Sequence, residues 1–193
     1  MTNSTAPVRF LLAAERPATA WRNGGGVTRE VAGFPAGSGP DDFGWRVSLA
    51  DVASAGPFSA FPGVDRVITL VEGPGMALTV DGVEHVVDAP FHPFAFPGDA
   101  ATDCRPLGGP LVDFNVMTRR GRVTADLVLA GTPRPVTVPP DATVLLVCLS
   151  GTAALDDTAL ARYDAALLTT PATHELRPGG LTAVVTFRGT PQT

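Results

Sequence analysis

The chain of 193 residues contains no lysine, because all 14 of its basic residues are arginines. This absence excludes a Walker A phosphate-binding loop and enzymes that form a Schiff base on a lysine amine. Charged residues make up only 17% of the chain, and the formal net charge is −5. This charge argues against nucleic acid or an anionic membrane surface as a partner. No apolar run reaches the length of a membrane span.

Cysteine is scarce as well, which fits a reducing compartment. The two cysteines are Cys104 and Cys148, and Cys148 lies in an apolar run where it resembles a small buried hydrophobic residue. Near the N-terminus, the apolar run from Phe10 to Ala14 is too short for a signal peptide. We therefore expect a cytoplasmic protein.

Glycine and proline are abundant, with 21 and 19 residues, and both disfavour helix interiors. Only one short helix is expected, from about Ser54 to Phe61. Alternating patterns that are typical of β-strands recur instead, and Asp81-Gly82 is a strong hairpin signal. The sequence therefore predicts an all-β fold. The expected strands cover 45–50, 66–71, 76–81, 112–117, 142–149 and 181–187.

An internal repeat indicates two related halves. The segment VITLVEGPGMALTVDG aligns with VLLVCLSGTAALDDTA, so that Gly73 corresponds to Gly151, and the following segments align as well. Such a repeat is typical of two similar β-barrels or sandwiches in one chain. We expect an N-terminal half at 1–122 that contains a ligand pocket, a proline-rich connection at 123–140 and a C-terminal half at 141–193. Strands can be exchanged between the two halves.

Polar pairs on one face of three expected strands form the main candidate site. An outward polar face is the ordinary arrangement in an antiparallel sheet, but in a small barrel the same groups can line a mouth. An arginine there offers a planar fork that matches a carboxylate. The pairs are Thr28 with Glu30, Arg46 with Ser48, and Asp113 with Asn115, and Met117 shares the last face.

Other catalytic and metal-binding motifs are weak. The three histidines, His85, His92 and His174, lack the spacing of a metal site, and no GxSxG motif is present. The cluster at 119–122, which is rich in arginine, is expected to be a solvated loop. Three glycines at 24–26 favour a tight turn or a bulge at the start of a strand.

Four strings together resemble the HutD/Ves family: WRNGGGVTREVA, WRVSLADVASAGPFSAFPGVDRVITLVEGPGMAL, PFAFPGD and DFNVMTRRGR. The resemblance implies a bacterial cupin-like protein with two β-barrel halves, a bicupin, associated with histidine utilisation. It also implies binding of a pathway intermediate such as formylglutamate or urocanate, and modulation of that pathway. The strand around 76–80 lacks the histidine pair of metal-binding cupins, so neither a metal nor another cofactor is expected.

The family's motif positions divide into two sets here. We expect a metal-free pocket for a small anionic metabolite, with Arg46 holding a carboxylate, and a homodimer is possible through exposed edge strands. The alternative is an isomerase or hydrolase that uses Glu30 or Asp113, or an enzyme with a metal near His92. The expected ligand-binding residues are Thr28, Glu30, Arg46, Ser48, Asp113, Asn115 and Met117. The expected structural residues are Trp21, Asn23, Gly24, Gly25, Gly26, Gly56, Pro57, Phe58, Asp65 and Arg66, the last two as an ion pair in a turn.

Overall fold

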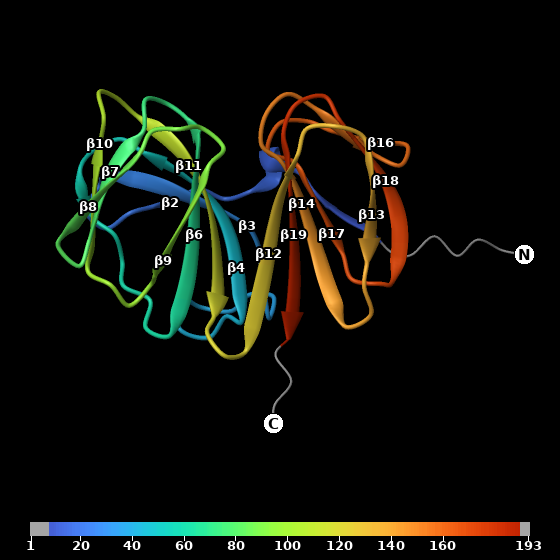
Figure 1. Ribbon diagram of the computed structural model, residues 1–193, viewed down its shortest axis with the longest axis horizontal. Coiled ribbons are helices and arrows are strands. Elements are labelled where there is room, and N and C mark those ends of the chain that lie inside the picture. The colour runs from blue at the N-terminus through green and yellow to red at the C-terminus, as the bar shows by residue number, and fades with distance from the viewer. Residues whose placement is uncertain (1–7, 190–193) are drawn as a thin grey trace, which may run out of the picture. The chain divides into compact units, whose positions relative to one another are not determined.

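The computed structural model describes residues 8–189, so the outer ends of both expected halves, 1–7 and 190–193, lie outside the described residues. The chain forms two compact units, one of residues 16–123 and one that combines 8–15 with 124–189. Both are built of β-strands, and a single 3-10 turn, η1 (Ala13–Glu15), is the helical element of the described part (Figure 1). Within residues 8–189 no helix is long and apolar enough to cross a membrane.

The unit of residues 16–123 contains two antiparallel sheets. The six-stranded sheet has the order β2-β3-β4-β11-β6-β9, and the four-stranded sheet has the order β5-β10-β7-β8. The strands of the larger sheet are β2 (Thr19–Ala20), β3 (Gly26–Phe34), β4 (Trp45–Val52), β6 (Val64–Glu72), β9 (Pro93–Pro97) and β11 (Leu111–Arg119). Those of the smaller sheet are β5 (Gly56–Pro57), β7 (Met76–Val80), β8 (Val83–Val87) and β10 (Thr102–Pro106).

An apolar core joins these two sheets. Ile68 and Leu70 of β6 belong to the same buried cluster as Met76 and Leu78 of β7. Since side chains alternate along a strand, this places the even-numbered residues of β6 on the inner face of the larger sheet. The opposite face is buried as well, as Phe114 of β11 has no exposed surface. The low charge fraction of the chain agrees with strands that are buried on both faces.

The second unit repeats this arrangement. Its five-stranded sheet has the order β1-β17-β14-β19-β12, and its four-stranded sheet the order β13-β18-β15-β16. The smaller sheets correspond strand by strand, and β6 and β7 correspond to β14 and β15, as the repeat predicts. The larger sheet contains β1 (Val8–Leu11), β12 (Val123–Ala130), β14 (Ala142–Cys148), β17 (Ala165–Leu168) and β19 (Thr182–Gly189). The smaller contains β13 (Arg134–Val138), β15 (Ala153–Leu155), β16 (Thr158–Leu160) and β18 (Ala172–Pro178).

The structure differs from the expected boundaries in two places. Strand β1 pairs with β17, so the N-terminal segment belongs to the C-terminal unit, an exchange of the kind that the sequence left open. Residues 123–140 form β12 and β13 instead of a connection. Pro135 fits within β13 because this strand is at the edge of its sheet, where a missing N–H costs little.

The expected helix from Ser54 to Phe61 is absent from this described segment. Gly56 and Pro57 form the short strand β5, which pairs with Cys104 and Asp103 of β10. The N–H of Phe58 donates to a carbonyl of the same neighbouring segment, that of Thr102, at 2.8 Å. Strand pairing therefore outweighs a local helical tendency that Gly-Pro already weakens.

Candidate functional site

A cavity of about 520 Å³ lies in the unit of residues 16–123. Its volume is within the range of about 300–1,000 Å³ that is usual for ligand pockets. Six of the seven predicted ligand-binding residues line it, all except Glu30. The lining residues are Thr19, Ala20, Trp21, Arg22, Asn23, Thr28, Pro40, Arg46, Ser48, Ala50, Pro57, Phe58, Ser59, Phe61, Arg66, Asp113, Asn115 and Met117.

Strand pairing arranges the polar side chains of the cavity in three rows across the larger sheet. Residues directly opposite one another on neighbouring strands place their side chains on the same face. The polar side chains that the sequence places on one face of these strands therefore point into the cavity, next to the apolar core of the unit. In the order β4, β11, β6, the rows are Arg46 with Met117 and Arg66, Ser48 with Asn115 and Ile68, and Ala50 with Asp113 and Leu70.

Arg66 was expected to form an ion pair with Asp65 in a turn, and this expectation is wrong. Both residues lie within strand β6, so their side chains point to opposite faces, and Asp65 pairs with Arg120 instead. Arg66 points into the cavity and is only 6% exposed. Period-two alternation places Arg66 on the same face as Ile68 and Leu70, but only the folded structure shows that this face lines the cavity.

Aromatic rings surround the Arg66 guanidinium. Its central carbon lies 5.2 Å from the Phe58 ring, 5.5 Å from the Phe61 ring and 4.9 Å from the Phe96 ring. Burial lowers the pKa of Arg66 to about 10, although the nearby Asp113 acts in the opposite direction. The buried Nε atom has no hydrogen-bond partner among the described residues. The Arg66 guanidinium is thus a charged group packed against aromatic rings, and its Nε atom can donate a hydrogen bond to a ligand.

Asp113 is the buried carboxylate of the cavity, with 1% of its surface exposed. Burial raises its pKa to about 7, with Arg66 acting to lower it and Asp51 to raise it. Its Oδ1 atom and the Oδ1 atom of Asn115 are both buried without a hydrogen-bond partner within residues 8–189. Unpaired buried acceptors of this kind are costly, so they indicate a place where a ligand or water supplies the missing donors.

Arg46 and Glu30 form an ion pair beside the cavity. The Arg46 Nε and Glu30 Oε2 atoms are 2.8 Å apart, and the side chains are 23% and 40% exposed. Glu30 lies opposite Ser48 in the sheet, just before a bulge in β3. This position lets Glu30 orient Arg46 without lining the cavity itself. Arg46 therefore faces the cavity as a guanidinium whose charge is already partly balanced.

The glycine-rich segment builds one wall of the cavity. Trp21 donates from Nε1 to the Thr28 hydroxyl at 2.7 Å and packs edge-on against Phe58, with ring centroids 5.9 Å apart. A Cβ atom on Gly26 would lie 2.5 Å from the carbonyl oxygen of Asp51 and 3.1 Å from the Trp21 ring. Close approach of backbone and ring thus requires glycine at this position.

Several lining residues had no signal in the sequence. Ala50 continues the alternation of Arg46 and Ser48 and could have been found from it. Phe61 was expected only as a packing residue. The remaining lining residues that the sequence did not indicate lie on β2 or in loops, where no periodicity shows the direction of a side chain. These residues are Thr19, Ala20, Arg22, Pro40 and Ser59.

Arg119 is not a solvated loop residue as the sequence suggested. It donates from Nε to the Phe43 carbonyl at 3.3 Å, from Nη1 to Pro62 at 3.0 Å and from Nη2 to Asp41 at 2.8 Å. Its guanidinium also lies over the Phe43 ring. The two loops that it joins carry Pro40 and Phe61 of the cavity lining.

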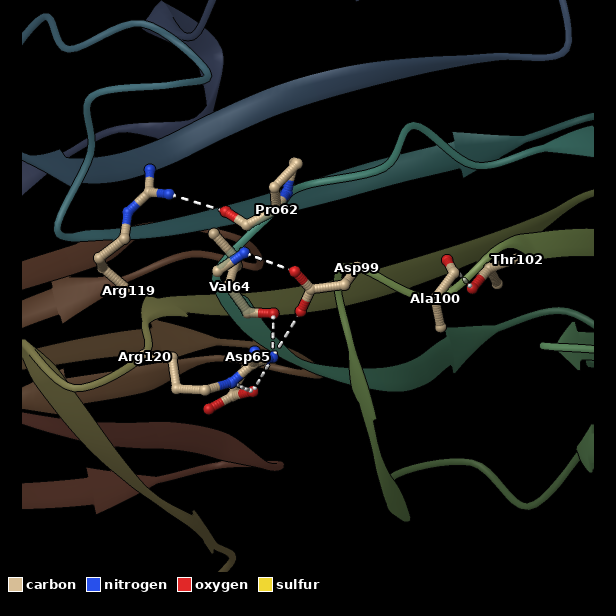
Figure 2. A network of polar contacts seen from close by, with 9 residues as sticks. Pro62, Val64, Asp65, Asp99, Ala100, Thr102, Arg119 and Arg120 are labelled. Atoms are coloured by element: carbon tan, nitrogen blue, oxygen red, sulfur yellow. Dashed lines mark hydrogen bonds and ion pairs between the residues drawn. The ribbon is translucent and has the colours of Figure 1, made fainter.

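Arg120 forms the second part of this network (Figure 2). It pairs with Asp65 and with Asp99, each at 2.7 Å, while Asp99 accepts a 2.7 Å hydrogen bond from the Gly63 N–H. These bonds lower the pKa of Asp99, chiefly through the Gly63 N–H and then through Arg120. The basic cluster thus fixes the loops beside the cavity.

A family model described as HutD matches residues 13–184. The chain belongs to the HutD family. A 21.2 kDa protein of Pseudomonas putida from the hutC 3′ region is 42% identical over 120 residues, which cover 62% of this chain and 63% of that protein. Protein Ves of Citrobacter koseri is 43% identical over 116 residues, 59% of each chain. The matched regions thus span less than two thirds of these relatives.

Solved structures show the same fold for this HutD-family chain. HutD from Pseudomonas fluorescens SBW25, in a formate condition, has a TM-score of 0.86 at 30% identity, covering 96% of this chain and all of that one. Pirin YhhW from Escherichia coli, in complex with nickel(II), has a TM-score of 0.64 at 10% identity, covering 97% of this chain and all of that one. The fold is cupin-like with two related antiparallel halves, as the resemblance implied.

A resident metal does not fit the cavity of this HutD-family chain. Its ionisable lining residues are three arginines and Asp113, and none of the lining residues is His or Cys. His85 instead packs on Phe94, and His92 Nδ1 lies 3.0 Å from the Pro90 carbonyl. In the described part of the chain no group of three or more His, Cys, Asp or Glu side chains could hold an ion. Arginines repel cations, so the donor set favours an anion.

Proposed function

We propose that the cavity binds a small organic anion from histidine degradation, such as formylglutamate or urocanate, and that this binding modulates the pathway. The observation that carries the proposal is the placement of Arg46 and Arg66 on either side of Met117, facing one cavity. The HutD family and the hutC-region relative support the link to histidine utilisation.

The rows suggest how such a ligand lies. A carboxylate at the first row meets Arg66, whose Nε lacks a partner, and Arg46, which Glu30 orients. A guanidinium–carboxylate contact is a charge-assisted hydrogen bond and is stronger than a neutral one. Asn115 and Ser48 supply neutral hydrogen bonds at the second row. Asp113 at the third row can receive a ligand N–H, such as that of a formamide or an imidazole.

Calorimetry tests the proposal directly. We expect formylglutamate or urocanate to bind the wild-type protein, and the Arg46→Ala, Arg66→Ala double variant to lose binding while it keeps its fold by circular dichroism. Arg105→Ala is the matched control, because Arg105 is an exposed arginine that pairs with Glu84 outside the cavity. Binding of equal strength to the double variant would contradict the site, and no binding to the wild type would contradict the ligand class.

A second function is favoured by one observation, the buried Asp113 with its pKa raised to about 7. A carboxylate with such a pKa suits a general base at neutral pH. The protein would then be a metal-free isomerase or hydrolase with Asp113 as the base, since Glu30, the other carboxylate considered, does not line the cavity. Incubation with histidine-pathway intermediates, followed by NMR, distinguishes the two functions: conversion that Asp113→Asn abolishes supports the enzyme, and unchanged intermediates support binding alone.

A further inference from the structure

Asp113 is the carboxylate in the cavity. Charged groups of neighbouring strands act on it, but its buried Oδ1 atom has no hydrogen-bond partner among the described residues. Arg66 acts on its charge from β6 and Asp51 from β4, while the ion pair of Arg46 on β4 with Glu30 on β3 lies at the first row, two rows away. From β10 the thiol of Cys104 approaches, and burial, followed by Asp113, raises the pKa of that thiol to about 12. Cys104 is therefore neutral near pH 7. Asp51 is itself paired with Arg29.

Two of the three lining arginines, Arg46 and Arg66, are balanced when Glu30 and Asp113 are both ionised, and the third, Arg22, is exposed to solvent. Arg46 is paired with Glu30, and Arg66 has Asp113 as its nearby counter-charge. An incoming carboxylate at the arginine row adds one negative charge to this group. Like charges repel one another more strongly near a buried group such as Asp113 than in bulk water. One of the three carboxylates therefore becomes costly to keep ionised.

Asp113 is the carboxylate whose protonation costs the least free energy. Glu30 keeps its ion pair and is 40% exposed, so its charge is solvated and balanced. Asp113 is 1% exposed, and no donor in the described part of the chain reaches its Oδ1 atom. Protonation also turns Asp113 from an acceptor into a donor, which can serve an oxygen of the ligand or the unpartnered Oδ1 atom of Asn115.

We propose that binding of an anion in this cavity is coupled to the uptake of one proton by Asp113. This inference rests on the proposed function, since it concerns the same site. The sign follows from electrostatics: an anion near Asp113 favours its neutral form, so the pKa of Asp113 is higher in the complex than the value of about 7 in the free protein. Between these two pKa values, affinity falls by up to about tenfold per pH unit as pH rises.

Calorimetry in buffers of different ionisation enthalpy measures the proton directly. N-formylglutamate is the ligand of choice, because its carboxylates titrate far below neutral pH. At pH 7.5 we expect uptake of a large fraction of one proton by the wild type, and uptake close to zero by Asp113→Asn. Asp126→Asn is the matched control, because Asp126 lies exposed on β12, outside the cavity. It should keep the wild-type uptake.

The wild-type measurement alone decides the inference if Asp113→Asn does not fold. Binding of N-formylglutamate with no proton uptake between pH 7 and pH 8 overturns the coupling and leaves the proposed function intact. Uptake that persists in a folded Asp113→Asn variant assigns the proton to another group and also overturns it. If neither N-formylglutamate nor urocanate binds, the proposed function fails and the coupling fails with it.

Discussion

Arg46 and Arg66 lie directly opposite the same residue, Met117, from the two strands that flank β11. Two guanidinium groups thus face one row of the cavity, across the width of three strands. They differ in their surroundings, because Arg46 forms an ion pair with Glu30 whereas Arg66 lies among phenyl rings. This difference makes their contributions to anion binding unequal.

Replacement of Arg66 by Ala should weaken binding more than replacement of Arg46 by Ala. Hydrogen bonds to charged groups contribute about 1.5–3 kcal/mol, so we expect the dissociation constant for formylglutamate to rise by about 10- to 100-fold in Arg66→Ala. The loss in Arg46→Ala should be smaller, because its charge is shared with Glu30. Titration calorimetry of both single variants checks this order, and the reverse order would show that Arg46 is the main anion contact.

Replacement of Arg119 by Ala should loosen the loops beside the cavity. The side chain donates to carbonyl groups of Asp41, Phe43 and Pro62. We expect a lower melting temperature and a dissociation constant raised severalfold, since the loops carry Pro40 and Phe61 of the lining.

Arg122→Ala is the control for this experiment, because Arg122 is an exposed arginine three residues away that does not line the cavity. It should leave both quantities unchanged. Equal effects of the two substitutions would mean that the loops do not depend on Arg119.

Replacement of Asp113 by Asn should stabilise the free protein at high pH. The pKa of Asp113 is raised to about 7 in the folded protein, so the folded state holds a proton that the unfolded state releases near pH 4. This group's contribution to stability therefore decreases as pH rises from about 4 to 7.

The Asp113→Asn variant does not lose this stability as pH rises, because an amide does not titrate. We expect its melting temperature to exceed that of the wild type by on the order of 5 °C at pH 8, with little difference at pH 5. Thermal unfolding across this pH range gives the measurement, and a variant that is less stable at pH 8 would contradict the raised pKa.

Replacement of Gly26 by Ala should destabilise the glycine-rich wall. The new Cβ atom would meet the Asp51 carbonyl and the Trp21 ring, so the strand must move, at a cost of about 1–3 kcal/mol. Gly39→Ala is the control, because its Cβ atom would meet only the Asp42 carboxylate at 3.8 Å. Denaturant unfolding and Trp fluorescence should change in the first variant alone.

Sequence alone predicted six of the strands and much of the cavity lining. Alternation along β4 and β11 identified Arg46, Ser48, Asp113 and Asn115 as one set, because side chains two apart share a face. The excess of glycine and proline excluded a helical bundle, and the internal repeat predicted two related barrels or sandwiches. The missing lysines left arginine as the cation of the site.

Only the tertiary structure decided which polar faces point inward and which distant residues meet there. Alternation separates two faces but does not say which one is covered, so Arg66 appeared as part of a turn until β6 paired with β11. Pairing of β1 with β17 joins residues far apart in the chain, and no local pattern encodes it. The raised pKa of Asp113 has the same origin, since burial and the approach of Arg66 and Asp51 exist only in the folded unit.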